Sequence, residues 1–242
     1  MHPVLFRLGS LEIHTYGVLV AAGFLLGITT ATKRAKAEGI EPERINDLGV
    51  WLIVDGMLGG KLFHIIFFWC EFIDGWRATG IASLREGFVF YGGFICASLS
   101  GVTYIRLKKL PLAKVADAFA PSIALGHAFG RLGCFFEGCC YGKACALPWA
   151  VKFPAFQVSV HPTQLYEAAG NLAIFAGLTL YRKRFDGQVW WLYVLSYGAL
   201  RFGVEFFRGD YDVYYFGVFT LGHVIAAAMI VIALAGYRLT RT

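Results

Sequence analysis

The chain has 242 residues, of which 57% are hydrophobic, 17% aromatic and only 16% charged, with a mean hydropathy of +0.59. Soluble domains usually carry about 25% charged residues, so this composition excludes an ordinary soluble protein and indicates an integral membrane protein. The formal net charge is +6, and the placement of the basic residues decides whether that charge implies an acidic partner.

Seven apolar segments are predicted to be transmembrane helices, because a spanning helix needs roughly 20 mostly apolar residues. They cover residues 16–32, 48–69, 88–106, 112–133, 163–181, 188–207 and 214–236. No Ser- or Pro-rich linker and no low-complexity tract separates them, so we expect a single membrane domain over residues 1–242. The predicted fold class is an all-α polytopic membrane protein.

Basic residues gather in four of the predicted connections and so orient the chain. These connections are 33–44, 106–114, 182–184 and 238–241. Cytoplasmic loops carry the excess of Lys and Arg, so we expect the N-terminus outside and the C-terminus in the cytoplasm. The positive charge then follows from topology and requires no nucleic-acid partner. Two outside stretches, 70–87 and 134–162, are long enough for small interfacial elements.

The second predicted span contains charged residues. Asp55, Lys61 and His64 lie there among glycines. Charges inside a span cost roughly 2.5–3.5 kcal/mol each on insertion scales and mark functional positions. A glycine-broken helix that carries them is expected to face protein or a wet cavity. The third span opens with FVFYGGF, in which Tyr91 precedes two glycines.

The fourth span ends in the polar stretch GHAFGRLG. His127 and Arg131 are four residues apart, so they share one helix face near the outer end. Pro121 is expected to kink this helix. A lone histidine is usually a packed residue, but the arginine beside His127 also supports a functional role, and both interpretations stay open.

Four cysteines follow in the stretch 134–162, at spacings of five, one and five residues. They are Cys134, Cys139, Cys140 and Cys145. This is not the C-x2-C pairing of structural zinc sites, which argues against a metal. An oxidising outer compartment favours one or two disulfides. Free thiols, one of them in contact with substrate, are the remaining possibility.

The motif VHPTQLYE, residues 160–167, opens the fifth span. Pro162 suits a first helical turn. Glu167 complements the positive end of the helix dipole, so helix capping would explain it. Gln164 and Glu167 are three residues apart and are expected to point the same way.

The sixth span carries a ladder of polar residues in YGALRFGVEFFR. Tyr197, Arg201, Glu205 and Arg208 are spaced four, four and three apart, within about 80° on one helix face. Arg201, Glu205 and Arg208 could form a row of salt bridges that needs no other partner. Two arginines with one carboxylate nevertheless leave a surplus positive charge, and the guanidinium fork suits a phosphate.

Six motifs together resemble the bacterial prolipoprotein diacylglyceryl transferase family. They are IHTYG (13–17), GGKLFHIIF (59–67), VFYGGFI (89–95), GRLGCFFEGCCYGK (130–143), HPTQLYE (161–167) and YGALRFGVEFFR (197–208). They run nearly end to end, and the last two are the most specific. The fourth motif is similar to a divergent variant of the family with a GCFxxGCCYG signature.

The resemblance implies a multi-pass enzyme of the bacterial cytoplasmic (inner) membrane whose active site faces the outer leaflet. Such an enzyme transfers the diacylglyceryl group of phosphatidylglycerol to the lipobox cysteine thiol of a prolipoprotein and releases glycerol phosphate. This is the first step of lipoprotein maturation. The implied partners are phosphatidylglycerol, membrane lipids and prolipoprotein signal peptides, and no metal or organic cofactor is expected.

The resemblance also implies roles for residues. Arg131 and Arg201 match family arginines that hold the head group, and we expect them to bind the phosphate and stabilise the charge of the leaving group. The other head-group candidates lie in or beside the motifs: Arg208, Glu205, Tyr197, Tyr16, Lys61, Gln164 and Glu167.

Several positions depart from the family pattern. The usual HGG is YGG here, so Tyr91 stands where a histidine often proposed as the base would lie. Cys134 and Glu137 replace two asparagines, and Cys139 takes the place of a glutamate. The residues that could compensate are Tyr91, His127 and His161 as the base and Glu137 as the carboxylate; alternatively, the thiolate forms without a dedicated base.

Two other functions stay open on the sequence alone. One keeps the fold and the phospholipid donor but uses a different acceptor. The other is a non-catalytic lipid-binding or transport protein, because intramembrane charges are also common in transporters. The polar groups gather toward the outer half of the spans, which favours an enzyme.

Overall fold

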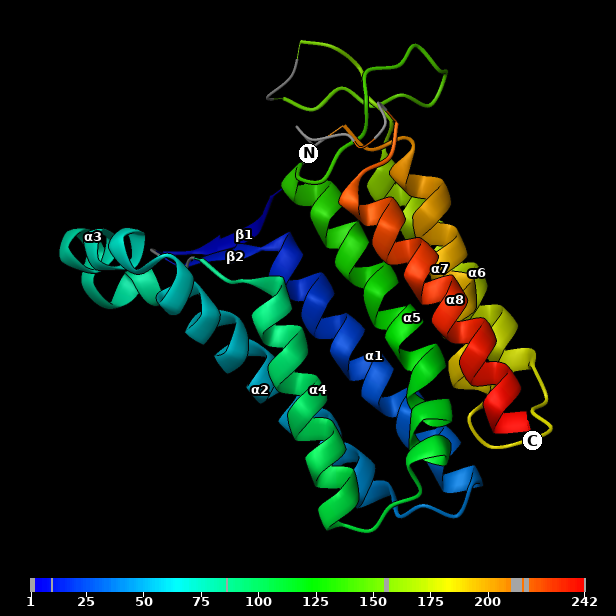
Figure 1. Cartoon of the computed structure of the whole chain (residues 1–242). Helices are drawn as coiled ribbons and strands as arrows, with labels where there is room; N and C mark the ends of the chain where they lie inside the picture. The colour runs from blue at the N-terminus through cyan, green and yellow to red at the C-terminus, as the bar shows by residue number, and fades with distance from the viewer. Residues whose placement is uncertain are drawn as a thin grey trace. The chain divides into compact units, whose positions relative to one another are not determined.

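The computed structural model describes residues 3–9, 11–85, 87–154, 157–209, 215 and 218–241. Its elements follow one another in the chain as shown in Figure 1. They are β1 (Val4–Leu8), β2 (Leu11–His14), α1 (Thr15–Ala37), α2 (Pro42–Phe67), α3 (Trp69–Thr79), the 3-10 helix η1 (Gly80–Arg85), α4 (Phe90–Leu107), α5 (Leu112–Glu137), α6 (Thr163–Leu180), α7 (Gln188–Glu205) and α8 (Leu221–Arg241). The chain divides into a first unit, Met1–Arg34 with Ala116–Thr242, and a second unit, Ala35–Val115.

The helical class predicted from the sequence is confirmed. Each predicted span overlaps one long α-helix, and the outside stretch 70–87 overlaps α3 and η1. Within the described residues, three helices, α1, α2 and α8, are long and apolar enough to cross a membrane. The last predicted span, 214–236, begins at residues that lie partly outside the described chain, and its helix starts at Leu221.

A β-hairpin at the N-terminal end adds two short strands to this helical fold. β1 and β2 pair antiparallel, with Arg7 opposite Glu12, and these two side chains form an ion pair of 2.9 Å. Gly9 follows β1 with a φ of 61°, a conformation that favours glycine in a tight turn. The segment FRLGSLEI therefore contains a hairpin signal that hydropathy alone does not detect.

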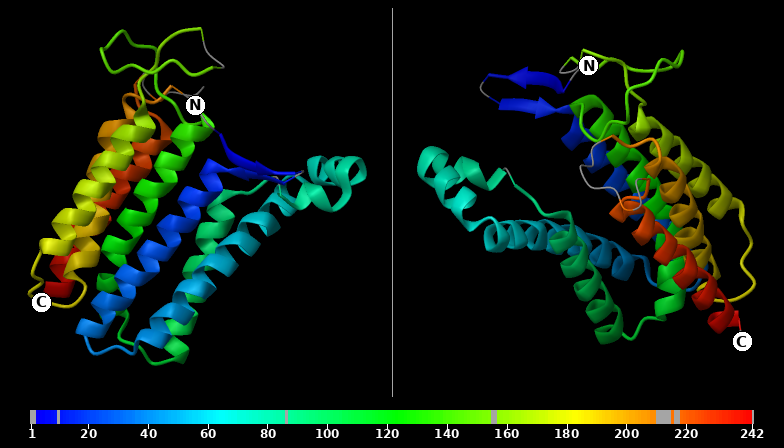
Figure 2. Two further views of the ribbon diagram at one scale, coloured as in Figure 1. Left: turned by 180° about the vertical axis from the view of Figure 1, so that it is seen from behind. Right: turned by 45° about the horizontal axis from the view of Figure 1, so that its top comes forward.

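In the first unit, α5, α6, α7 and α8 run side by side (Figures 1 and 2). Small residues bring these helices close together, as is common in membrane bundles. A Cβ on Gly170 of α6 would lie 2.4 Å from Leu200 of α7, and one on Gly198 would lie 3.3 Å from the Ala226 carbonyl oxygen of α8. The close α6–α7 contact brings the polar face of α7 against the start of α6.

A buried carboxylate fixes the beginning of α7. Asp117 of α5 is 2% exposed and accepts hydrogen bonds from the backbone N–H groups of Gly187 (2.8 Å) and Trp190 (2.9 Å). Lys183 lies 3.4 Å from the same carboxylate. Since the first N–H groups of a helix have no partner within the helix, Asp117 supplies acceptors from a neighbouring helix.

In the second unit, α2 packs along α4 through glycines. A Cβ on Gly59 would lie 2.8 Å from the Gly92 carbonyl oxygen, and one on Gly93 would lie 2.6 Å from the Gly56 carbonyl oxygen. The glycines of α2 were expected to break the helix, but α2 is continuous from Pro42 to Phe67. They serve close helix contact instead, because two backbones can approach where no side chain intervenes.

Candidate functional site

A buried carboxylate, Glu167, is the centre of a polar cluster in the first unit. Its side chain is 1% exposed. One oxygen lies 3.3 Å from His127 Nε2 and accepts a 3.3 Å hydrogen bond from the Tyr197 hydroxyl. The other lies 3.1 Å from Arg131 Nε and 3.4 Å from Arg201 Nη1. A buried charge requires such partners to offset its lost hydration.

Helical spacing on three elements builds this cluster. His127 and Arg131 lie one turn apart on α5, where Arg131 Nε also lies 3.2 Å from His127 Nε2. Tyr197 and Arg201 lie one turn apart on α7. Glu167, the fifth residue of α6, contacts both pairs. Two i, i+4 pairs on neighbouring helices therefore converge on one carboxylate.

The cluster continues from Arg201 to a second buried carboxylate. Arg201 Nη2 lies 2.7 Å from Glu205, which is 1% exposed. The Thr220 hydroxyl donates to Glu205 at 2.5 Å, and the Thr220 N–H donates to His223 Nδ1 at 3.1 Å. His223 is buried and lies 4.4 Å from the Phe206 ring centroid. The end of α7 and the start of α8 are thus joined by one polar chain.

A third arginine, Arg208, follows the end of α7 and is also buried. The side chains of Arg131 and Arg201 keep 18% and 14% of their area exposed, so an anion can reach them. Guanidinium groups bind phosphate oxygens through paired N–H donors.

These contacts decide between several interpretations of the sequence. The α7 ladder does form the Arg201–Glu205 pair, and Arg201 in addition reaches Glu167 on another helix. Glu167 is not a helix cap, because α6 begins after Pro162 without a side-chain capping bond. His127 is part of the polar cluster rather than an isolated packed histidine.

Gln164 and Tyr16 lie beside the cysteine-bearing end of α5. Gln164 is 1% exposed and donates a 2.6 Å hydrogen bond to the Cys139 carbonyl oxygen. It therefore positions the loop after α5, whereas Glu167 binds the arginines. Tyr16 is exposed on one side, and its ring fills the space beside Gly133, where a Cβ would lie 2.9 Å from the ring.

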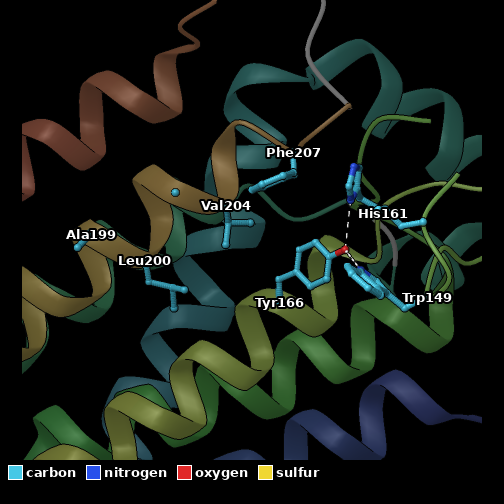
Figure 3. A pocket seen from close by; sticks show the side chains of 9 residues that line it. Trp149, His161, Tyr166, Ala199, Leu200, Val204 and Phe207 are labelled. Atoms are coloured by element: carbon cyan, nitrogen blue, oxygen red, sulfur yellow. Dashed lines mark hydrogen bonds between the residues drawn. The ribbon is translucent and has the colours of Figure 1, made fainter. Parts of the chain in front are cut away.

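His161 lies in a separate pocket of about 540 Å³ between the loop, α6 and α7 (Figure 3). Its Nδ1 is 3.2 Å from the Tyr166 hydroxyl, which also accepts a 2.8 Å hydrogen bond from Trp149. Its ring packs against Phe207 at 5.1 Å. Leu200 and other apolar side chains line the rest. The hydrogen bond and the ring contacts of the His161 side chain are thus with aromatic residues of this pocket.

Three further candidates lie away from the Glu167 cluster or in the second unit. Glu137, the last residue of α5, is exposed and has no ion pair within the described part of the chain. Tyr91 belongs to the second unit, is 57% exposed and contacts the Phe90 ring edge-on. Lys61, in the same unit, donates to the Ser83 carbonyl oxygen at 3.0 Å.

Sequence reasoning missed Thr220 and His223, which complete the surroundings of Glu205. A histidine inside the apolar run LGHVIAAAM is itself an intramembrane titratable residue, and that signal could have identified it. Nothing in the local sequence pointed to Thr220, because its role depends on the approach of α8 to α7.

Among the described residues, one group could hold a metal ion. It consists of Cys134, Cys139 and Cys140, whose Sγ atoms all lie within 4.8 Å of one another. All six cysteines of the chain are free thiols in the structure. The expected disulfides are therefore not formed, although the predicted clustering of thiols is.

These features define a helical membrane protein with a buried arginine–carboxylate cluster. The family model described as prolipoprotein diacylglyceryl transferase matches residues 3–239. A phosphatidylglycerol–prolipoprotein diacylglyceryl transferase of Clostridium tetani is 38% identical over 87% of this chain and 86% of its own length. One of Finegoldia magna is 36% identical over 96% of this chain and 92% of its own length. The chain belongs to the prolipoprotein diacylglyceryl transferase family.

Proposed function

We propose that this chain transfers the diacylglyceryl group of phosphatidylglycerol to the lipobox cysteine thiol of prolipoproteins. The relatives that share most of its length carry that activity in their names. The observation that carries the proposal is the convergence of Arg131 and Arg201 on the buried Glu167. It holds two guanidinium groups together at one place, and in this proposal they bind the phosphate of the donor.

In this reaction the acceptor thiol loses its proton to water, and the thiolate sulfur attacks the glyceryl carbon that bears the phosphate ester. The carbon–oxygen bond breaks, and its electron pair stays on the phosphate oxygen of the departing glycerol phosphate. Arg131 and Arg201 bind that phosphate and stabilise the charge that it gains, which is electrostatic catalysis by preorganised donors. Glu167 acts as a positioning residue, because it holds both guanidinium groups in one place.

The proposed location is the outer leaflet of the bacterial inner membrane. In the first unit, the Glu167 cluster lies at the start of α6 and the end of α7, while the basic segment Arg182–Arg184 lies at the opposite end of these helices (Figure 1). Basic loops mark the cytoplasmic side. This arrangement supports a site that opens toward the outer leaflet and seven spans with the N-terminus outside.

The test is expression in a bacterial host depleted of its own diacylglyceryl transferase, with one model lipoprotein analysed by intact mass. We expect a gain of one diacylglyceryl group on the lipobox cysteine. An unmodified precursor, in cells whose membranes contain the folded protein, would contradict the proposal. Purified protein with labelled phosphatidylglycerol then separates a different acceptor, which consumes donor without labelling the peptide, from loss of catalysis, which leaves the donor intact.

A further inference from the structure

Three cysteine thiols, those of Cys134, Cys139 and Cys140, lie close together at the end of α5. Helix α5 ends at Glu137, and Gly138 adopts a φ of 80°. The N–H groups of Gly138 and Cys139 both donate to the Cys134 carbonyl oxygen, at 3.0 and 3.2 Å. This is the left-handed helix end that glycine favours. It turns the chain back, so that Cys139 and Cys140 lie over Cys134 with all three Sγ atoms within 4.8 Å.

Two buried side chains of α6 hold this turn in place. Gln164 donates to the Cys139 carbonyl oxygen at 2.6 Å, and Thr163 donates to the Cys140 carbonyl oxygen at 2.9 Å. Each of these side chains is 1% exposed. They belong to the same helix as Glu167, so the position of the thiols is tied to the arginine–carboxylate site.

We propose that Cys134, Cys139 and Cys140 bind one Zn²⁺ ion as thiolates and leave its fourth position open for the acceptor thiol of the prolipoprotein. With Zn–S bonds of about 2.3 Å in a tetrahedron, sulfur atoms lie about 3.8 Å apart, which the 4.8 Å limit of this cluster accommodates. Thiolates are soft ligands that select zinc over hard cations. Three protein ligands with an open position are the pattern of catalytic zinc, whereas structural sites have four.

The surroundings suit such an ion. A zinc ion with three thiolates carries one net negative charge, and a bound acceptor thiolate adds another. Cys139 is exposed while Cys134 and Cys140 are partly buried, which leaves one side of the cluster accessible to a peptide.

The inference rests on the proposed function and supplies its nucleophile. A metal-bound thiol is deprotonated outright, and the thiolate is the nucleophilic form. The acceptor thiol would bind zinc and release its proton to water. Its sulfur would then form the bond to the glyceryl carbon as the carbon–oxygen bond breaks and the electron pair leaves with glycerol phosphate. Zinc keeps its oxidation state throughout, and no separate base is required.

Metal binding is tested first, on the purified full-length protein in detergent under reducing conditions, with Co²⁺ as an absorbing probe. We expect thiolate-to-cobalt charge-transfer absorption that saturates at about one ion per chain, as for a single site, and that Zn²⁺ abolishes. Cys134→Ser, Cys139→Ser and Cys140→Ser should each lose this absorption. Cys145→Ser, outside the cluster, should retain it. A reduced wild-type protein that binds no Co²⁺, or an equal loss in Cys145→Ser, would overturn the inference.

Acceptor activation is tested with a lipobox peptide and its Cys→Ser counterpart. Only the cysteine peptide should increase the charge-transfer absorption, because it adds a fourth thiolate. Chelated protein should lose at least about tenfold in transfer rate and regain it with Zn²⁺, as expected when a metal supplies the nucleophile. Full activity of metal-free protein, or a cysteine peptide that leaves the spectrum unchanged, would refute the inference while leaving the proposed function standing.

Failure of the proposed function alone would give a different result from failure of the zinc site. A protein that binds Co²⁺ and the peptide thiol but never transfers a diacylglyceryl group would refute the proposed function and retain the metal site. A disulfide among the three cysteines of active protein, found by mass spectrometry of non-reduced peptides, would overturn the zinc site, because a disulfide leaves too few thiolates.

Discussion

At the scale of single residues, Glu167 organises the site. It is buried, and it contacts His127, Arg131 and Arg201 from two other helices. Without its charge, the two arginines would repel each other in a poorly hydrated place. The Glu167 carboxylate therefore stabilises the fold, and it also fixes the positions of the two guanidinium groups that are proposed to bind phosphate.

Glu167→Gln keeps the size of this side chain and removes its charge. We expect transfer activity to fall at least about 10²-fold, as when a preorganised charge-stabilising group is lost. We also expect stability to fall by about 3 kcal/mol, because buried arginines lose their partner. Radiolabelled transfer assays and thermal unfolding in detergent measure the two effects. Glu12→Gln, on the exposed hairpin, is the control, and wild-type activity in Glu167→Gln would refute the positioning role.

Arg201 is expected to be sensitive even to lysine. Its Nη1 lies 3.4 Å from Glu167 and its Nη2 lies 2.7 Å from Glu205. A single ammonium group cannot reproduce this fork. Arg201→Lys should lower kcat/KM for phosphatidylglycerol by about tenfold or more, and Arg201→Ala should lower it further. Arg182→Lys, at an exposed loop position, should have no effect. Equal rates in the Arg201→Lys variant and the wild type would show that charge alone suffices.

The sequence predicts part of this site because helical spacing is a local property. The pairs His127–Arg131 and Tyr197–Arg201 were both predicted to share a face, and both do so in the cluster. The sequence could not decide whether Glu167 caps its helix or meets these arginines, because the answer depends on the packing of α6 between α5 and α7. The same holds for Thr220, which reaches Glu205 only through the approach of α8.

At the scale of elements, close helix contacts depend on glycine at particular positions. Gly93 of α4 lies against the Gly56 carbonyl oxygen of α2, 2.6 Å from where a Cβ would be, whereas Gly177 of α6 has open space. Because a backbone carbonyl cannot rotate away as a side chain can, Gly93→Ala should destabilise the protein by about 1–3 kcal/mol, as overpacking does. Gly177→Ala should be neutral or slightly stabilising, because alanine favours helix. Unfolding temperatures in detergent compare the two, and equal values would contradict the tight contact.

The start of α7 offers a second test at this scale. Asp117→Asn keeps one acceptor oxygen and loses the charge that two backbone N–H groups and Lys183 share. We expect a loss of about 1–3 kcal/mol, the cost of a buried hydrogen-bond partner. Asp186→Asn removes only an exposed partner of Lys183 and is the matched control. Thermal unfolding again gives the measurement, and a wild-type midpoint in Asp117→Asn would show that the cap is dispensable.

The elements themselves were largely predictable because long apolar runs exclude most alternatives. Every predicted span holds a helix. The errors have physical causes: the hairpin at Val4–His14 is too short for a hydropathy window, and the glycines of α2 were expected to weaken a helix that the contact with α4 stabilises instead.

At the scale of the whole molecule, topology connects the site to its substrates. A prolipoprotein that has been exported across the membrane reaches the three cysteines at the end of α5 only if that end of the helix faces outside. The basic segments 182–184 and 238–241 should then be cytoplasmic. The basic residues of the sequence predict that the segment 70–87, which contains α3, also lies outside.

Labelling of intact cells with a membrane-impermeant thiol reagent tests this orientation. In a variant that keeps Cys70 of α3 as its only cysteine, we expect labelling of intact cells, because Cys70 is exposed and predicted to lie outside. In a cysteine-free variant carrying Arg182→Cys, labelling should require permeabilised cells. Labelling of Arg182→Cys in intact cells, or of Cys70 only after permeabilisation, would invert the topology. The proposed approach of the prolipoprotein from the outer side would then be wrong, whatever the chemistry at Glu167.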